Sequence, residues 1–410
     1  MIPEGWREAT AEELCSRISV GIVIKPTQYY VDEERGVRAF RSANIGEGFV
    51  QDSDWIHISE EGHAKNKKSA LKANDILIVR TGYPGTACLL PPEYEGSNCI
   101  DIIFARPDPR HVVPAYLCTF TNSEYGKKQV LDGSGGLAQQ HFNVGAYKKL
   151  KLPLPPLSEQ QRIAEILSTW DRAIATVEAL IANARAQKKA LMQSLLTGKK
   201  RLPGFSGEWS WVKFSDVFER VRERNNVGNT NVLTISAQHG LISQVEYFNK
   251  SVASDDVRGY TLLRRRDFAY NKSYSDGYPF GAFKPLELYD SGIVSSLYIC
   301  FRLCSAEHDH AFFRHYFEAG LFNREVAAIA QEGARNHGLL NVSIVDFFDT
   351  SLHAPSYEEQ VAIAQVINDA ERKECALADQ LAALRQEKSA LMQQLLTGKR
   401  RVKVDEREAA

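Results

Sequence analysis

The sequence has no long hydrophobic run and no cysteine pattern of a disulfide framework. None of its apolar stretches approaches the ~20 residues that cross a bilayer, so we expect no membrane contact. The first residues, MIPEGWREAT, lack the basic and apolar regions of a signal peptide. Seven scattered cysteines, an odd number, indicate reduced thiols and predict a cytoplasmic protein.

The chain also lacks a net charge of either sign. Its 50 lysines and arginines oppose 51 aspartates and glutamates, which gives a formal net charge of −1. Overall charge therefore does not indicate nucleic acid, and a DNA-binding hypothesis needs local evidence. The apolar fraction of 44% is ordinary for a globular protein, and 410 residues are enough for two or three domains.

The motifs of a catalytic centre are missing. An amino-methyltransferase carries Asn/Asp-Pro-Pro-Tyr/Phe, whereas the nearest text, LPPEY at 90–94, lacks the amide or acid. No Gly-rich turn follows a strand in the arrangement that binds S-adenosylmethionine. LLTGKK has Gln193 where a phosphate-binding loop needs its first glycine. These absences predict a non-catalytic chain.

One cluster has spacings that suggest zinc, namely Cys300, Cys304, His308 and His310. The two cysteines sit within or beside a strand-like run, where cysteine more often packs as a small hydrophobic residue. We therefore predict no metal site.

What the sequence has instead is an internal repeat. ALMQSLLTGKKR at 190–201 returns as ALMQQLLTGKRR at 390–401. Upstream, PPLSEQQRIAEIL corresponds in the same register to PSYEEQVAIAQVI. The chain therefore contains a duplicated unit of about 200 residues, and this repeat determines how the whole chain is organised.

Each copy ends in a long helix with a coiled-coil pattern. Apolar residues alternate between spacings of four and three over five heptads, which is typical of coiled coils. Two separate helical hairpins are the alternative to a pair in which each helix is the other's partner. The predicted seam consists of Ile163, Leu167, Trp170, Ile174, Val177, Ile181, Leu191, Leu195, Ile363, Ile367, Leu377, Leu381, Leu384, Leu391 and Leu395.

The segments outside the helices predict two compact mixed α/β domains. β-branched and aromatic runs such as DILIVRTG and GIVSSLYICF are separated by turn residues. The domain edges resemble each other, as in QQHFNV and RNHGLLNV, but the interiors do not visibly align. We predict domains at 1–152 and 202–352, helices at 153–201 and 353–401, and a tail at 402–410.

This order resembles the specificity (S) subunit of Type I restriction–modification enzymes, the HsdS family. PPLSEQQRIA with LLTGKKRLPGF is similar to the repeats of that family, and DFAYNKSYSDGYPFGAF with GIVSSLYICF is similar to one class of its target-recognition domains. LKANDILIVRTGYPGTA resembles another class, with Ala73-Asn74-Asp75 where a Gly-Asp pair is more usual. The second copy departs more, with Pro-Ser-Tyr in place of Pro-Pro-Leu and with Glu374 in its seam.

The resemblance implies a fold of mixed α+β class. It has two α/β target-recognition domains in tandem, each followed by a long helix, and the helices pair as an antiparallel coiled coil. Each domain would recognise one half of an asymmetric, bipartite site in double-stranded DNA. The helices would set the spacer and dock two modification (methyltransferase) subunits, to which restriction (nuclease/translocase) subunits attach.

The resemblance also implies that this chain holds no cofactor, because S-adenosylmethionine, ATP and Mg belong to the partner subunits. Three alternatives stay open. The first is a coiled-coil scaffold without DNA recognition, and the second is a specificity subunit of a related methyltransferase/nuclease system. The third is a subunit that takes part directly in methyl transfer or cleavage.

Long polar side chains near turns are the candidate DNA contacts, because arginine pairs with guanine, and asparagine or glutamine with adenine. A solvated surface role or a structural hydrogen bond is the competing interpretation for each of them. In the first domain the candidates are Arg41, Asn44, Arg80, Thr81, Gln139 and Gln140. In the second they are Arg264, Arg265, Lys272, Tyr274, Arg335 and Asn336.

Overall fold

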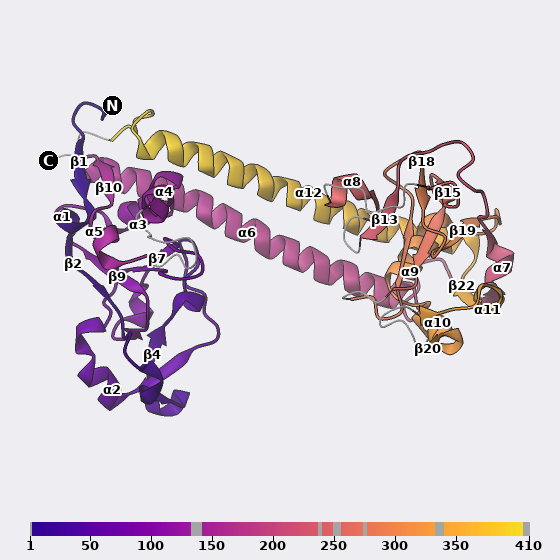
Figure 1. Cartoon of the computed structure of the whole chain (residues 1–410), viewed down its shortest axis with the longest axis horizontal. Helices are drawn as coiled ribbons and strands as arrows, with labels where there is room; N and C mark the ends of the chain where they lie inside the picture. Colours follow the sequence, from indigo (N-terminus) through magenta and orange to yellow (C-terminus); the bar gives the residue numbers. More distant parts are fainter. Residues whose placement is uncertain are drawn as a thin grey trace. The chain divides into compact units, whose positions relative to one another are not determined.

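A computed structural model describes residues 2–132, 142–236, 240–248, 256–273, 277–332 and 340–404 of the chain (Figure 1). The chain divides into two compact units. Unit 1 comprises Met1–Ala179 and Asp379–Ala410, and unit 2 comprises Leu180–Ala378. Across the described ranges, no helix combines the length and the apolar character needed to cross a membrane.

Two long helices contribute one half to each unit. Helix α6 spans Leu157–Leu195 and helix α12 spans Tyr357–Leu396, drawn in magenta and yellow in Figure 1. A glycine with a positive φ follows the end of each helix, Gly198 at +68° and Gly398 at +70°. This backbone conformation stops a helix and favours glycine.

Domain 1, the globular part of unit 1, contains two four-stranded sheets with the orders β2-β9-β6-β7 and β3-β5-β4-β8. A separate antiparallel pair, β1 with β10, brings together the two ends of the domain. The strands are β1 Arg7–Thr10, β2 Cys15–Val20, β3 Tyr30–Val31, β4 Gly36–Phe40, β5 Ile56–Ser59, β6 Ile76–Ile78, β7 Ala87–Leu89, β8 Asn98–Cys99, β9 Ile103–Pro107 and β10 Lys151–Leu154. The helices are α1 Ala11–Leu14, α2 Glu60–Lys65, α3 Pro114–Asn122, α4 Glu124–Asp132 and α5 Val144–Lys148.

Domain 2, the globular part of unit 2, repeats the first of these sheets as β12-β19-β16-β17 and closes its ends in the same way, with β11 paired to β22. Strands β13 and β14, β15 and β18, and β20 and β21 form two-stranded sheets. The strands are β11 Ser210–Lys213, β12 Phe218–Arg220, β13 Leu233–Ser236, β14 Gly240–Ser243, β15 Thr261–Arg264, β16 Phe268–Asn271, β17 Ala282–Pro285, β18 Ser291–Val294, β19 Ile299–Leu303, β20 Gln331–Glu332, β21 Leu340–Asn341 and β22 Ser351–Ala354. The helices are α7 Phe214–Val217, α8 Gln244–Phe248, α9 His310–Glu318, α10 Asn323–Ile329 and α11 Ile344–Asp349. The two domains therefore share a core sheet that their sequences did not reveal.

In unit 1 the two long helices run antiparallel. Lys388 of α12 pairs with Asp171 of α6 at 2.5 Å, and Arg385 pairs with Glu178 at 2.6 Å. Residue numbers thus rise along one helix as they fall along the other, which is the helix pairing that the family resemblance implied.

Unit 2 has the same antiparallel pairing, and it shows how the polar residues of the seam are accommodated. Glu374, which interrupts the apolar pattern of α12, forms ion pairs with Arg185 and Lys188 of α6, both at 2.7 Å. Burial alone would raise the pKa of the Glu374 carboxyl, but the two cations outweigh it and lower that pKa. Two charges that would each weaken a seam alone therefore compensate each other.

Every residue of the predicted seam is buried or half-buried. Ala184 and Lys188, which continue the same spacing, are also buried or half-buried. At each end the seam merges with a domain core, so the helices are part of the globular folds. The buried members of the predicted set are Ile163, Leu167, Val177, Ile181, Leu195, Ile363, Ile367 and Leu395, and the half-buried ones are Trp170, Ile174, Leu191, Leu377, Leu381, Leu384 and Leu391.

A repeated ion pair joins the start of each long helix to the end of the other. In unit 2, Arg201, which follows α6, donates two hydrogen bonds to Glu359 near the start of α12, at 2.6 and 2.5 Å. In unit 1, Arg401, which follows α12, donates to Glu159 of α6 at 3.0 and 2.5 Å. The two-pronged geometry is the strongest arrangement for arginine and a carboxylate.

The glutamine next to each of these glutamates fastens a domain to its long helix. The Gln160 side chain is buried, accepts the backbone N–H of Val113 at the start of α3 (2.8 Å) and donates to the carbonyl of Pro155 (2.8 Å). Gln360 makes the same two contacts, with the N–H of Asp309 before α9 (2.9 Å) and with the carbonyl five residues before it (2.9 Å). The Glu-Gln of both repeats is therefore a docking element.

We expect Glu359→Gln to lower the midpoint of thermal unfolding by roughly 3–6 °C, because the Glu359 side chain is 2% exposed and its loss of charge leaves Arg201 without a counterion. The matched control is Glu358→Gln, which removes a charge from the exposed neighbouring position. Scanning calorimetry of the full chain measures both. Equal midpoints for the two variants would show that the repeated pair contributes nothing.

Candidate nucleic-acid interface

In domain 1 the predicted contacts Arg80 and Thr81 lie where strand β6 turns toward β7. The hairpin loop TGYPGT, residues 81–86, passes through Gly82 and Gly85, whose φ values are +94° and +86°. The N–H of Gly85 donates to the carbonyl of Val79 at 3.0 Å and closes the loop. The Gly-rich segment is therefore a tight turn that projects from the end of the core sheet.

Arg80 ties this hairpin to a second predicted segment. Its Nη1 donates to Asp101 at 2.5 Å, and its Nε donates to the carbonyl of Phe142 at 3.2 Å. The N–H of Phe142 in turn donates to the carbonyl of Arg80 at 3.1 Å. Phe142 directly follows residues 133–141, which carry the candidates Gln139 and Gln140, and both glutamines lie outside the described residues.

Domain 2 has the same arrangement at the equivalent place. The carbonyl of Lys272, at the end of β16, accepts the N–H of Leu340 at 3.1 Å. Leu340 directly follows residues 333–339, which carry the candidates Arg335 and Asn336; these two and Tyr274 lie outside the described residues. In both domains, the residue that directly follows the undescribed stretch therefore bonds to the strand end that carries another candidate.

Both hairpins contain the tripeptide Gly-Tyr-Pro, a shared feature that our sequence reasoning missed. Gly82-Tyr83-Pro84 lies in domain 1 and Gly277-Tyr278-Pro279 in domain 2, and both glycines have positive φ. The tripeptide is visible in the sequence, but its two copies are 195 residues apart, whereas the long helices repeat at an offset of 200. The two copies therefore do not align in the register of the helix repeat. Tyr83 is 84% exposed, whereas the hydroxyl of Tyr278 donates to Glu318 at 2.8 Å.

The candidates Arg264 and Arg265 are not brought to the hairpin. Arg264 ends β15 and Arg265 lies in the turn that leads into β16, at the opposite end of that strand from Lys272. Arg264 pairs with Glu223 and Arg265 with Asp290, each at 3.0 Å, and both side chains are more than half exposed. They stay predicted contacts at a place separate from the hairpin.

This turn is held by a buried aspartate in both domains. Asp267 accepts two hydrogen bonds from Arg302, at 2.6 and 2.7 Å, and one from the N–H of Arg264 at 2.8 Å. In domain 1, Asp75 accepts the corresponding bonds from Arg106, at 2.8 and 2.7 Å. Each aspartate therefore neutralises an arginine of the neighbouring strand β9 or β19 and pins the turn.

The residue before each aspartate has a left-handed backbone, with φ of +67° at Asn74 and +75° at Arg266. Glycine adopts this conformation without steric cost, and asparagine tolerates it better than most other residues. The structure therefore explains why Asn74 stands where the resembling family more usually has glycine.

Asn44 has a structural role. It is fully buried, its Oδ1 accepts the N–H of Arg41 at 3.0 Å, and its Nδ2 donates to the carbonyl of Ser53 at 2.8 Å. A base edge cannot reach an amide without exposed surface, so we withdraw Asn44 as a candidate DNA contact. Arg41 donates from Nη2 to Asp54 at 3.1 Å and keeps 30% of its side chain exposed.

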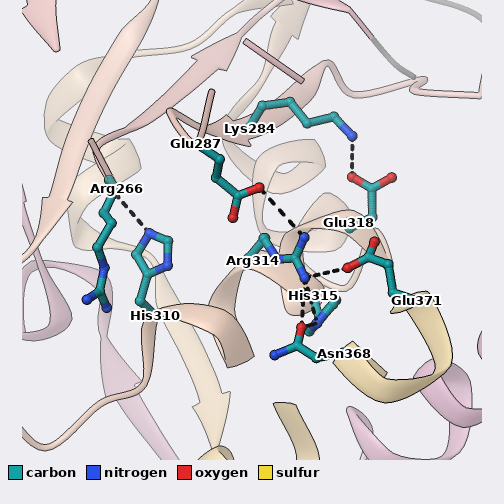
Figure 2. A network of polar contacts seen from close by, with 9 residues as sticks. All are labelled: Arg266, Lys284, Glu287, His310, Arg314, His315, Glu318, Asn368 and Glu371. Carbon is teal, nitrogen blue, oxygen red and sulfur yellow. Dashed lines mark hydrogen bonds and ion pairs between the residues drawn. The ribbon is translucent and has the colours of Figure 1, made fainter. Parts of the chain in front are cut away.

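A polar network fastens α9 of domain 2 to α12 (Figure 2). Nη2 of Arg314 donates to Glu371 at 2.6 Å and to Asn368 at 2.8 Å, and its Nη1 lies 3.7 Å from Glu287. His315 Nε2 lies 2.7 Å from the Asn368 Oδ1. One arginine thus joins a strand end, a domain helix and a long helix within unit 2.

The charges of this network are fixed by burial and by one another. Burial, followed by the neighbouring Arg314, lowers the pKa of His315, which is therefore neutral at pH 7. Burial alone would raise the pKa of Glu371, but Arg314 outweighs it and lowers that pKa. In acid, His315 takes up a proton more readily in the unfolded chain than in unit 2, so falling pH weakens the folded junction.

We expect Arg314→Ala to destabilise unit 2 by about 1–3 kcal/mol, because it leaves the half-buried Glu371 without its cation. The control is Arg324→Ala, which removes an exposed arginine from α10. Hydrogen exchange of α9 and of residues 357–378 locates the effect. Unchanged protection in the Arg314 variant would contradict a junction held by this side chain.

Comparison with known proteins gives one consistent family. Residues 4–185 match the family model described as a Type I restriction modification DNA specificity domain. The EcoBI specificity subunit of a Type I restriction enzyme from Escherichia coli is 24% identical over 199 residues, 48% of this chain and 41% of that protein. The putative MjaX specificity subunit from Methanocaldococcus jannaschii is 25% identical over 206 residues, 48% of this chain and 46% of that protein. The matched stretch spans less than half the length of these curated relatives.

Solved structures match nearly the whole chain in fold. An HsdS subunit from Thermoanaerobacter tengcongensis has a TM-score of 0.51 at 17% identity, covering 97% of this chain and 98% of that chain. A Type I S subunit from M. genitalium has a TM-score of 0.56 at 13% identity, covering 96% of each chain. A chain from a study of complex assembly in the type I R-M system has a TM-score of 0.57 at 17% identity, covering 97% and 98%.

The fold thus defines a class of protein with two α/β domains, each joined to the ends of two long antiparallel helices. By the family model over residues 4–185 and by its curated relatives, this chain is similar to the specificity subunits of Type I restriction–modification systems. The fold class predicted from the sequence is confirmed. The family predicted from the sequence is supported by the family model and by the curated relatives.

Proposed function

We propose that this chain is the DNA-recognition subunit of a Type I restriction–modification system, in which each domain recognises one half of an asymmetric, bipartite site. One observation carries the proposal. The two domains share a core sheet, a buried aspartate turn and a hairpin, while the residues displayed on the hairpins differ. Two copies of one framework with different surface residues suit the recognition of two different sequences.

The chain acts without chemistry of its own, in the cytoplasm. Its partners are two methyltransferase subunits and the restriction subunits that attach to them. S-adenosylmethionine, ATP and Mg belong to those partners. This proposal is supported by the missing catalytic motifs and by the names of the relatives.

Each unit has a cleft along the long helices that suits a docked partner. The cleft of unit 1 has a volume of about 860 Å³ and is lined by exposed rings of Phe49 and Tyr125 together with Ile174 and Met392. Exposed aromatic rings beside apolar side chains are typical of protein-binding surfaces.

The cleft of unit 2, of about 520 Å³, is lined by the corresponding stretch of α6, with Lys188 and Met192 in place of Lys388 and Met392. One cleft of each kind suits two copies of a methyltransferase subunit. A coiled-coil scaffold without DNA recognition would not require matched hairpins in two large domains.

We expect exchange of domain 2, residues 210–354, for that of a relative to change one half of the recognised site and leave the other intact. The exchange retains Arg201 and Glu359, and residues 368 and 371 are taken from the same relative so that the junction of Figure 2 stays matched. Sequencing of methylated adenines in a host that carries the complete system identifies both half-sites.

The reciprocal exchange of domain 1, residues 7–154, is the matched control and should change only the other half-site. An exchange that alters both halves would contradict independent recognition. An exchange that alters neither half would show that the domains do not specify sequence.

A further inference from the structure

The hairpin of domain 1 carries an aromatic ring that the fold does not use. Tyr83 is the most exposed large hydrophobic side chain within the described ranges, at 84%. Among the residues that the structure describes, its hydroxyl has no hydrogen-bond partner. A ring that stays in water contributes little to folding, because hydrophobic stabilisation follows the apolar area removed from water.

The backbone nevertheless holds this ring in a defined place. The N–H of Thr86 donates to the carbonyl of Tyr83 at 3.2 Å, and the glycines on either side have the positive φ that a tight turn requires. Gly85 packs against Val130 of α4, where an added Cβ would lie 3.0 Å from the valine side chain. A ring on a fixed turn loses little conformational entropy when it binds.

The surroundings of the ring favour nucleic acid over another protein. The rest of the loop is Thr, Gly and Pro, which offer no apolar patch, and the nearest charged residue along the chain is Arg80. Arg80 is already paired with Asp101, so the ring is the group of this loop that stays available for contact. In the grooves of double-stranded DNA, apolar and aromatic side chains pack on base edges such as the thymine methyl group.

The equivalent tyrosine of domain 2 differs in a way that supports a function for Tyr83. Tyr278 is half-buried, its hydroxyl is bonded to Glu318, and Lys284 lies 5.2 Å from its ring centroid. Its ring therefore packs against the domain. The same turn presents a ring outward in one domain and holds it back in the other.

We propose that Tyr83 is a specificity-determining residue whose ring packs against the bases of the half-site that domain 1 recognises. The proposal rests on the proposed function and adds a contact that neither the motifs nor the polar candidates suggested. It makes the hairpin of domain 1 a recognition element that acts by ring contact.

The test uses the complex of this chain with its methyltransferase subunits and a duplex that contains the methylated site. The domain 1 half-site is the half that stays unchanged when domain 2 is exchanged. Tyr83→Ala should weaken binding to this duplex by about tenfold, the effect expected from the loss of one contact to a base edge. Tyr83→Phe keeps the ring and should bind like the parent. Trp211→Ala, which removes a 64% exposed ring from β11, is the control and should also bind like the parent.

A second duplex with a scrambled domain 1 half-site separates the possible results. Tyr83→Ala should bind it as weakly as the parent does, so that the loss falls on the cognate duplex alone. Cognate binding by Tyr83→Ala equal to that of the parent would overturn the inference while leaving the proposed function intact. A parent complex that prefers neither duplex would overturn both.

Discussion

The fold depends on one ion pair that occurs twice. Arg201 binds Glu359 in unit 2, and Arg401 binds Glu159 in unit 1, so the end of each long helix is fastened to the start of the other within the same unit. Because the glutamates are almost fully buried, each pair persists only if both helices are in place. The adjacent glutamines then connect that constraint to the domains, because they accept the backbone N–H groups of Val113 and Asp309, the residues directly before α3 and α9. A duplicated chain is thereby divided into two units, each of which needs residues from both repeats.

The two domains differ in sequence mainly at positions that this framework of buried contacts does not constrain. The aspartate turns at Asp75 and Asp267 and the Gly-Tyr-Pro hairpins persist in both domains, since each involves a buried charge or a backbone conformation that few residues tolerate. The side chains around them differ, from Arg80 to Lys272 and from an exposed to a half-buried tyrosine. This is the pattern expected of recognition domains, in which a rigid scaffold positions variable loops.

The sequence predicted the parts of the structure that follow from spacing. Heptads and the repeated LLTGK ending are local patterns, so the long helices and their family could be recognised directly. The shared core sheet was not predicted, because many apolar side chains can fill the same strand positions, and the interiors retain little identity. Two further features could not be predicted from the sequence: the structural role of Asn44, which we had expected to contact DNA, and the ion pairs of Glu374 with Arg185 and Lys188. Both depend on partners distant in the chain, and spacing alone carries no information about them.

The central claim of the proposed function is that the paired helices set the length of the spacer between the two half-sites. Because α6 and α12 are each fastened at both ends, one heptad must be inserted into both, after Ala182 and after Ala378, to keep the seam and both ion pairs. Each helix then lengthens by roughly 10 Å, which corresponds to at most about three base pairs at the ~3.4 Å rise of DNA. The measurement is the sequence of methylated sites in a host that carries the complete system with this doubly inserted chain. The account predicts unchanged half-sites separated by a spacer one to three base pairs longer, and methylation at sites with the original spacer would contradict it.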